Sequence, residues 1–163
     1  MRYNIREIAD GDEPSIRCIF NHYIENSYAA FPEERVGPGF LGMIKNMAQG
    51  YPFYVIADDS GKVIGFGFLH RYHPFPVFSR AAEISYFISP ECTRKGLGTE
   101  LLGRLVEAAK GQGIETLLAS ISSLNEASIS FHSRNGFKIC GRFEKIGKKT
   151  GKDFDVVWMQ LFI

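Results

Sequence analysis

The sequence has few of the features that mark secreted, metal-binding or membrane proteins. Its three cysteines, Cys18, Cys92 and Cys140, are far apart, and no two have the spacing of a zinc site or a disulfide framework. No apolar run approaches the roughly 18 residues of a membrane span. Residues 1–15, MRYNIREIADGDEPS, lack the apolar core of a signal peptide. These absences predict a reduced, cytoplasmic protein with no metal site and no membrane association.

Neither sign of charge is in excess, since 19 Lys and Arg residues face 18 Asp and Glu residues. A balanced chain has no bulk attraction for nucleic acid or acidic lipid, so neither is expected as a partner. The length of 163 residues is typical of one domain, and we expect a single domain over 1–163.

The apolar pattern predicts a mixed order of strands and helices. Helices are expected at 12–27, 40–48, from 97 to the glycines at 111 and 113, and at 125–134; strands are expected at 3–8, 53–57, 62–70, 81–88, 116–121, 137–143 and 155–162. A long antiparallel part precedes one strand–helix–strand unit. This order predicts an α+β fold with a mixed, largely antiparallel sheet flanked by helices, and not a doubly wound parallel sheet.

The segment CTRKGLGTELL (92–102) has the residues of a phosphate-binding loop. A helix start offers free N–H groups to an anion, glycines let the backbone approach it, and Arg94 and Lys95 add positive charge. Neither the nucleotide P-loop nor the dinucleotide fingerprint fits, because Lys95 precedes Gly96 and Leu101 stands where a third glycine would be. A glycine-rich helix entry with two solvated cations would give the same pattern, so the loop alone leaves both interpretations open.

Four motifs in order resemble those of the GNAT N-acetyltransferases. Residues 94–99, RKGLGT, resemble the family's pyrophosphate loop, and residues 125–137, NEASISFHSRNGF, resemble the helix that follows the next strand. Residues 82–98, AEISYFISPECTRKGLG, and 146–160, IGKKTGKDFDVVWMQ, are similar to two motifs of the phosphinothricin/methionine-sulfone acetyltransferase branch. The resemblance covers nearly the whole chain and implies the GNAT fold.

The resemblance implies that acetyl-CoA binds as a co-substrate along the strand at 83–88. The backbone of Tyr86, Phe87 and Ile88 would hold the pantetheine arm as an added strand, and the Ile88 N–H could polarise the thioester carbonyl. Asn125 would bond the pantetheine amide or cap its helix, and Ser128 would lie near the cofactor or in solvent. The pyrophosphate would lie against Arg94, Lys95, Gly96, Leu97, Gly98 and Thr99.

Glu83 is the expected general base, because acetyl transfer needs a neutral amine and aliphatic amines titrate near 10. Strand alternation puts Glu83 on one face with Ser85 and Phe87, opposite the face of Ala82, Ile84, Tyr86 and Ile88. The alternative is a structural Glu paired with Arg71 or Arg80.

His132 occupies a helix position where the resemblance implies a general acid for the leaving thiolate. An imidazole can donate a proton near neutral pH, but a single helical His is often a packed or surface residue. Both interpretations of His132 stay open.

Substrate recognition is expected from Phe31 and from Arg80, although the branch has its Arg four residues before the catalytic Glu, where this chain has Ser79. The lysines at 148, 149 and 152 could bind an acidic substrate group or stay solvated. The leading hypothesis is N-acetylation of a small amino-acid-like amine of the phosphinothricin or methionine sulfone/sulfoximine type. Alternatives are acetylation of a protein N-terminus or lysine, and a non-catalytic acyl-CoA sensor. The resemblance alone implies a homodimer.

Overall fold

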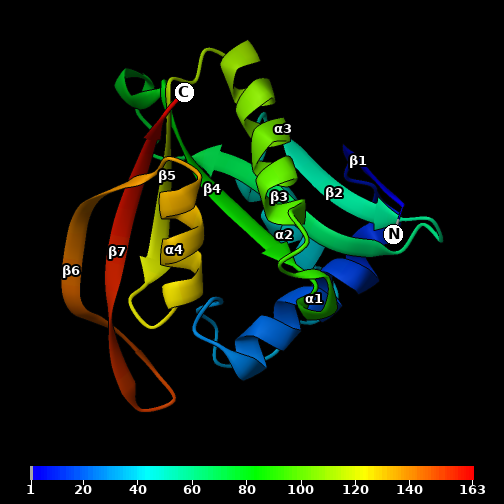
Figure 1. Cartoon of the computed structure of the whole chain (residues 1–163), viewed down its shortest axis with the longest axis horizontal. Helices are drawn as coiled ribbons and strands as arrows, with labels where there is room; N and C mark the ends of the chain where they lie inside the picture. Colours follow the sequence, from blue (N-terminus) through cyan, green and yellow to red (C-terminus); the bar gives the residue numbers. More distant parts are fainter. Residues whose placement is uncertain (1) are drawn as a thin grey trace.

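The computed structural model describes residues 2–163, whose strands form a seven-stranded sheet between two layers of helices (Figure 1). The strands are β1 (Tyr3–Glu7), β2 (Phe53–Asp58), β3 (Val63–Arg71), β4 (Ala81–Ile88), β5 (Thr116–Ser122), β6 (Lys138–Lys149) and β7 (Lys152–Phe162). The helices are α1 (Glu13–Asn26), α2 (Phe40–Met47), α3 (Leu97–Gly111) and α4 (Glu126–Arg134). Short 3-10 turns lie at Asp10–Asp12, Pro76–Phe78 and Pro90–Cys92.

The sheet has the strand order β1-β2-β3-β4-β5-β7-β6. Only β4 and β5 run parallel in this sheet of residues 2–163, and the other neighbours are antiparallel. A parallel pair needs a crossover, which α3 supplies. The predicted α+β fold with a mixed, largely antiparallel sheet is confirmed.

Each face of the sheet is covered by helices. The apolar side of α3, including Leu101 and Leu105, packs on one face together with Leu117 and Met159 of the sheet. On the other face, α1 and α2 pack on an aromatic-rich group that includes Phe66. The buried side chains of α1 and α3 recur at the helical spacing on which these two helices were predicted.

The β6–β7 hairpin is longer than the sequence indicates. Strands were expected to end at 143 and restart at 155, whereas the ladder continues to Lys149 and Lys152. Two register shifts, at Ile139/Gly141 and at Phe143/Gly147, bend β6 and obscure its alternation. A Cβ on Gly147 would overlap the ring of Phe154, so the second irregularity lies where only glycine fits.

Within residues 2–163, no helix has both the length and the apolar character that crossing a bilayer requires.

Candidate active site

β4 and β5 pair over only three residues each, Ala81–Glu83 with Thr116–Leu118. Beyond Glu83, β4 continues along β3 and β5 continues along β7. The two strands therefore diverge, and the edge of β4 that faces β5 has no partner strand after Glu83 in the described chain. We call this opening the splay.

Strand alternation decides which backbone groups face the splay. The N–H of Ser89 donates to the carbonyl of Ile64 at 2.8 Å, so this residue's backbone faces the β3 side. The backbone groups of Ile88 and Tyr86 then point the other way, into the splay. Those of Phe87 face β3, inside the ladder. The expected backbone role of Phe87 in holding the pantetheine is corrected accordingly, while the roles of the other two stay predictions.

The loop between β4 and α3 leaves several N–H groups free beside the splay. Gly96, with φ +83°, caps α3 through its carbonyl, which accepts from the N–H groups of Thr99 and Glu100. The N–H groups of residues 95–98 donate to no protein group within 2–163. Arg94 is exposed, and the Lys95 Nζ donates to the Glu91 carbonyl at 2.9 Å. Free N–H groups at a helix N-terminus with two cations form a site that fits a pyrophosphate.

Helix α4 lies next to this loop. A Cβ on Gly98 would lie 3.2 Å from the Phe131 ring, so glycine allows α3 to start close against α4. Asn125 caps α4, its Oδ1 accepting from the Ser128 N–H at 3.2 Å, which confirms the predicted cap. The expected cofactor contacts of Asn125 and Ser128 stay predictions.

His132 is buried, with only 4% of its surface exposed. Its Nδ1 lies 2.7 Å from the Ser128 carbonyl, which can only accept, so Nδ1 carries the proton of the neutral ring. Nε2 then accepts from the Tyr86 hydroxyl at 2.5 Å. Burial lowers the pKa of His132 and raises the pKa of Tyr86, so the site favours the neutral form of each side chain. The two ring nitrogens of His132 are thus occupied within the protein.

Glu83 is half-buried and faces the side of the sheet that α1 covers, as alternation predicted. Its carboxylate contacts neither Arg71 nor Arg80. Its partner is His70 of β3, with Oε2 3.4 Å from Nε2. Burial raises the pKa of the Glu83 carboxyl, as expected for a base that must take up a proton. Arg80 instead pairs with Glu115 on the surface at 3.4 Å.

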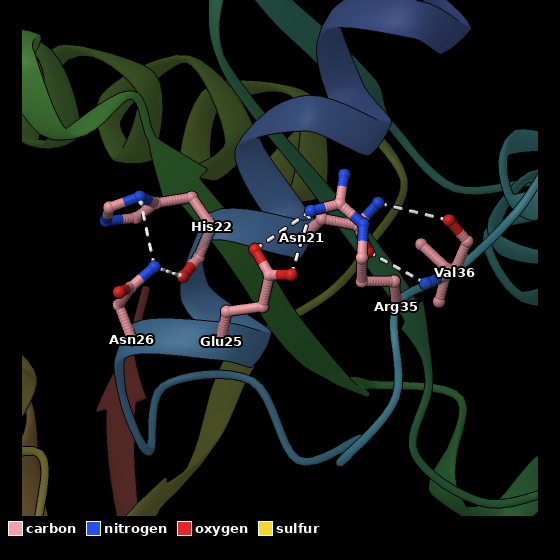
Figure 2. A network of polar contacts seen from close by, with 6 residues as sticks. All are labelled: Asn21, His22, Glu25, Asn26, Arg35 and Val36. Carbon is pink, nitrogen blue, oxygen red and sulfur yellow. Dashed lines mark hydrogen bonds and ion pairs between the residues drawn. The ribbon is translucent and has the colours of Figure 1, made fainter.

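The loop from α1 to α2, where Phe31 lies, is held by polar contacts (Figure 2). Asn21 is 3% exposed and bonds both backbone groups of Val36, accepting from its N–H at 2.7 Å and donating to its carbonyl at 3.1 Å. Arg35 returns to Glu25 of α1 at 2.8 Å. Phe31 remains 47% exposed and stacks on Phe154 of β7, with ring centroids 5.8 Å apart.

Lys149 at the tip of the β6–β7 hairpin holds the first part of the same loop. Its ammonium donates to the carbonyls of Ile24, Ser27 and Ala30 at 2.7, 2.8 and 2.7 Å. Only 3% of the surface of Lys149 is exposed. Burial lowers the pKa of this ammonium. The expectation that Lys149 binds substrate or stays solvated is wrong, because every proton of the ammonium bonds a backbone carbonyl.

A family model described as an acetyltransferase (GNAT) domain matches residues 10–158. The chain belongs to the GNAT acetyltransferase family. This acetyltransferase is 35% identical over 163 residues to an L-methionine sulfoximine/L-methionine sulfone acetyltransferase of Pseudomonas aeruginosa, covering 99% of this chain and 95% of that one.

Two solved structures are similar over nearly the whole length. One is a phosphinothricin acetyltransferase from Sinorhizobium meliloti in complex with acetyl-CoA, with a TM-score of 0.92, 27% identity, and coverage of 100% and 89% of the two chains. The other is a ribosomal-protein-alanine N-acetyltransferase from Brucella melitensis, with a TM-score of 0.90, 30% identity, and coverage of 98% and 99%. This chain is therefore a GNAT N-acetyltransferase with the fold of that family.

Three features of the acetyltransferase site were missed at the level of sequence. His70 meets Glu83 through the β3–β4 register, Tyr86 meets His132 across the splay, and Lys149 reaches back to α1. The β3–β4 hairpin could have suggested that His70 lies near Glu83, but the long loop between the two strands left their register unknown.

Within residues 2–163, no three His, Cys, Asp or Glu side chains lie close enough together to hold a metal ion.

Proposed function

We propose that this N-acetyltransferase moves the acetyl group of acetyl-CoA to the amine of a small amino-acid-like substrate, with Glu83 as general base. The observation that carries the proposal is a half-buried carboxylate at the inner end of the splay, where β4 leaves β5. The relative that acts on methionine sulfoximine and sulfone supports this class of acceptor.

The chemistry requires few groups. Glu83 accepts a proton from the attacking amine, the amine nitrogen bonds to the carbonyl carbon, and the C–S bond breaks with its electron pair on sulfur. The Ile88 N–H, which points into the splay, would polarise the thioester carbonyl. The loop at 94–99 would hold the pyrophosphate, with the Asn125 amide on the pantetheine.

The leaving thiolate needs a proton, and the resemblance implies His132 as its donor, with a packed histidine as the alternative. Both nitrogens of His132 are bonded within the protein, so a proton from this ring would have to pass through the Tyr86 hydroxyl. On the substrate side, we retain Phe31 and Arg80 as contacts. Arg80 would first have to leave Glu115, an exposed pair of the kind that is worth about 0–1 kcal/mol.

A thiol-release assay with acetyl-CoA tests the base. Acceptors would be L-methionine sulfone, L-methionine sulfoximine, phosphinothricin and a peptide with an N-terminal alanine. Glu83→Gln should lower kcat/KM by about 10²–10⁴-fold, the range for a lost general base. Glu107→Gln, an exposed acid of α3 paired with Arg104, is the matched control and should keep the wild-type rate. A Glu83→Gln enzyme as fast as the control would refute the proposed base.

The same assay addresses a second candidate function. The likeness to a ribosomal-protein-alanine N-acetyltransferase favours a protein N-terminus as acceptor. Turnover of the alanine peptide without turnover of the free amino-acid analogues would support it over the small-molecule acceptor.

We further propose that the enzyme is a homodimer. Large apolar side chains are exposed on the β6–β7 hairpin, with Ile139, Phe143 and Ile146 at 60%, 53% and 61% and Phe162 at 79%. Such side chains are common at subunit contacts.

A further inference from the structure

The register of β3 and β4 brings a histidine against the candidate base. His70 and Glu83 are directly opposite, and the N–H of Leu69 points to the Pro52 carbonyl on the other side, so the backbones of His70 and Glu83 face each other. Residues opposite on antiparallel strands project to the same face. The two side chains meet there, with Nε2 and Oε2 3.4 Å apart and with 17% and 21% of their surfaces exposed.

The other ring nitrogen of His70 decides where its proton lies. Nδ1 is 3.2 Å from the carbonyl oxygen of Arg71, which can only accept, so Nδ1 carries a hydrogen. A neutral His70 would then turn the bare Nε2 toward a carboxylate oxygen, and two lone pairs would repel each other. One proton between Nε2 and Oε2 removes the repulsion. The pair without that proton, with its two atoms at the ion-pair distance of 3.4 Å, is therefore disposed to take one up.

The surroundings favour sharing of that proton. Burial raises the pKa of Glu83 and lowers the pKa of His70, so the pKa values of the two side chains lie closer together than those of free Glu and His. The Phe68 ring lies 6.1 Å from the imidazole, and the Arg71 side chain is exposed. Within residues 2–163, no second ion pair or side-chain hydrogen bond reaches either group.

We propose that His70 and Glu83 act as one proton-accepting dyad in acetyl transfer, an inference that rests on the proposed role of Glu83. The Glu83 carboxylate takes the proton that the amine nitrogen loses as it bonds to the acetyl carbon. That proton then moves to Nε2 of His70, giving an imidazolium bonded to Glu83 and to the Arg71 carbonyl. The thiolate that leaves with the C–S electron pair takes a proton from solvent, either directly or through Tyr86–His132, which regains its own proton from solvent, and the dyad returns its proton to solvent. His70 is thus a positioning and proton-storing residue behind Glu83.

Imidazole nitrogen NMR of the intact protein tests the dyad without any acceptor. The chain has four histidines, and His70→Gln identifies the His70 signals by their loss. In the wild type His70 should titrate at a higher pH than in Glu83→Gln, because the carboxylate stabilises the imidazolium. The Nδ1–H form should dominate when the ring is neutral. An identical titration midpoint in both proteins would overturn the dyad.

The pH profile of kcat/KM gives the second measurement, with L-methionine sulfone and the other acceptors named above. The base must be deprotonated, so the rate falls as pH falls through the pKa of the pair. The dyad binds its proton more tightly than Glu83 alone. His70→Gln should therefore slow the reaction by at least about tenfold and move the acid limb to lower pH. His22→Gln, an exposed histidine of α1, is the control and should change neither.

The outcomes separate the two proposals. If Glu83→Gln is nearly inactive while His70→Gln matches the wild type in rate and acid limb, the dyad is refuted and the base stands. If Glu83→Gln is as fast as the wild type, the proposed base and the proposed dyad are both refuted. If no acceptor reacts, the NMR midpoints alone decide whether the dyad exists.

Discussion

Substituting Lys149 tests how the hairpin tip holds the loop between α1 and α2. Lys149→Met keeps the length of the side chain and removes three donors from the carbonyls of Ile24, Ser27 and Ala30. Those carbonyls lie 119 to 125 residues away in sequence, so the bonds connect the two ends of the chain. A methionine cannot replace any of them.

The expected destabilisation follows from two opposing terms. Hydrogen bonds to charged groups contribute about 1.5–3 kcal/mol each, and carbonyls left without partners lose part of their solvation. Against this, the substitution removes a buried ammonium, whose transfer from water costs several kcal/mol. We expect a net loss of roughly 2–4 kcal/mol, a large part of the 5–15 kcal/mol that is typical for a domain.

Urea unfolding followed by circular dichroism measures the loss. The matched control is Lys148→Met, since Lys148 is 67% exposed and pairs with Asp153 at 3.4 Å on the surface. It should change the free energy of unfolding by less than about 1 kcal/mol. The reasoning is refuted if Lys149→Met unfolds at the same urea concentration as this control.

Two further predictions concern the cofactor loop and the assembly. Arg94→Gln removes the cation that lies beside the free N–H groups of residues 95–98. It should raise the KM for acetyl-CoA by about tenfold and leave kcat little changed, because a charge-assisted hydrogen bond is worth about 1.5–3 kcal/mol. Steady-state kinetics measure both constants, and an unchanged KM would mean that Arg94 stays in solvent. The homodimer should appear as twice the 18.3 kDa chain mass in light scattering, and Phe143→Lys on β6 should shift it toward monomer, whereas a wild-type monomer contradicts the proposal.

Sequence patterns predicted those parts of the enzyme whose structure depends only on residues close together in the sequence. The alternation of β4 placed Glu83 on the correct face, because period 2 is a property of the strand itself. The loop around Gly96 was predicted because a helix start and its glycines are contiguous. Such features require no knowledge of the rest of the fold.

The missed contacts depend on distant segments. Lys149 lies among other lysines and glycines, a composition typical of a solvated loop. Its ammonium is buried only because α1 and the loop after it pack against the hairpin in the folded protein. His70 and Glu83 are 13 positions apart, and their meeting depends on how the loop at 72–80 sets the strand register. A one-residue shift would have put the histidine on the opposite face.

The short β4–β5 pairing also has a consequence for how the chain folds. Strands β1 to β4 have the same order in the sheet as in the sequence, and β5, β6 and β7 form the rest of the sheet with β7 between the other two, so each half of the sheet comes from one continuous part of the chain. Within residues 2–163, the two halves of the sheet are joined by only three strand residue pairs, which depend on the crossover through α3. Docking of the two halves is therefore a separate step from the assembly of either one, and it depends on the smallest set of strand pairs in the sheet of residues 2–163.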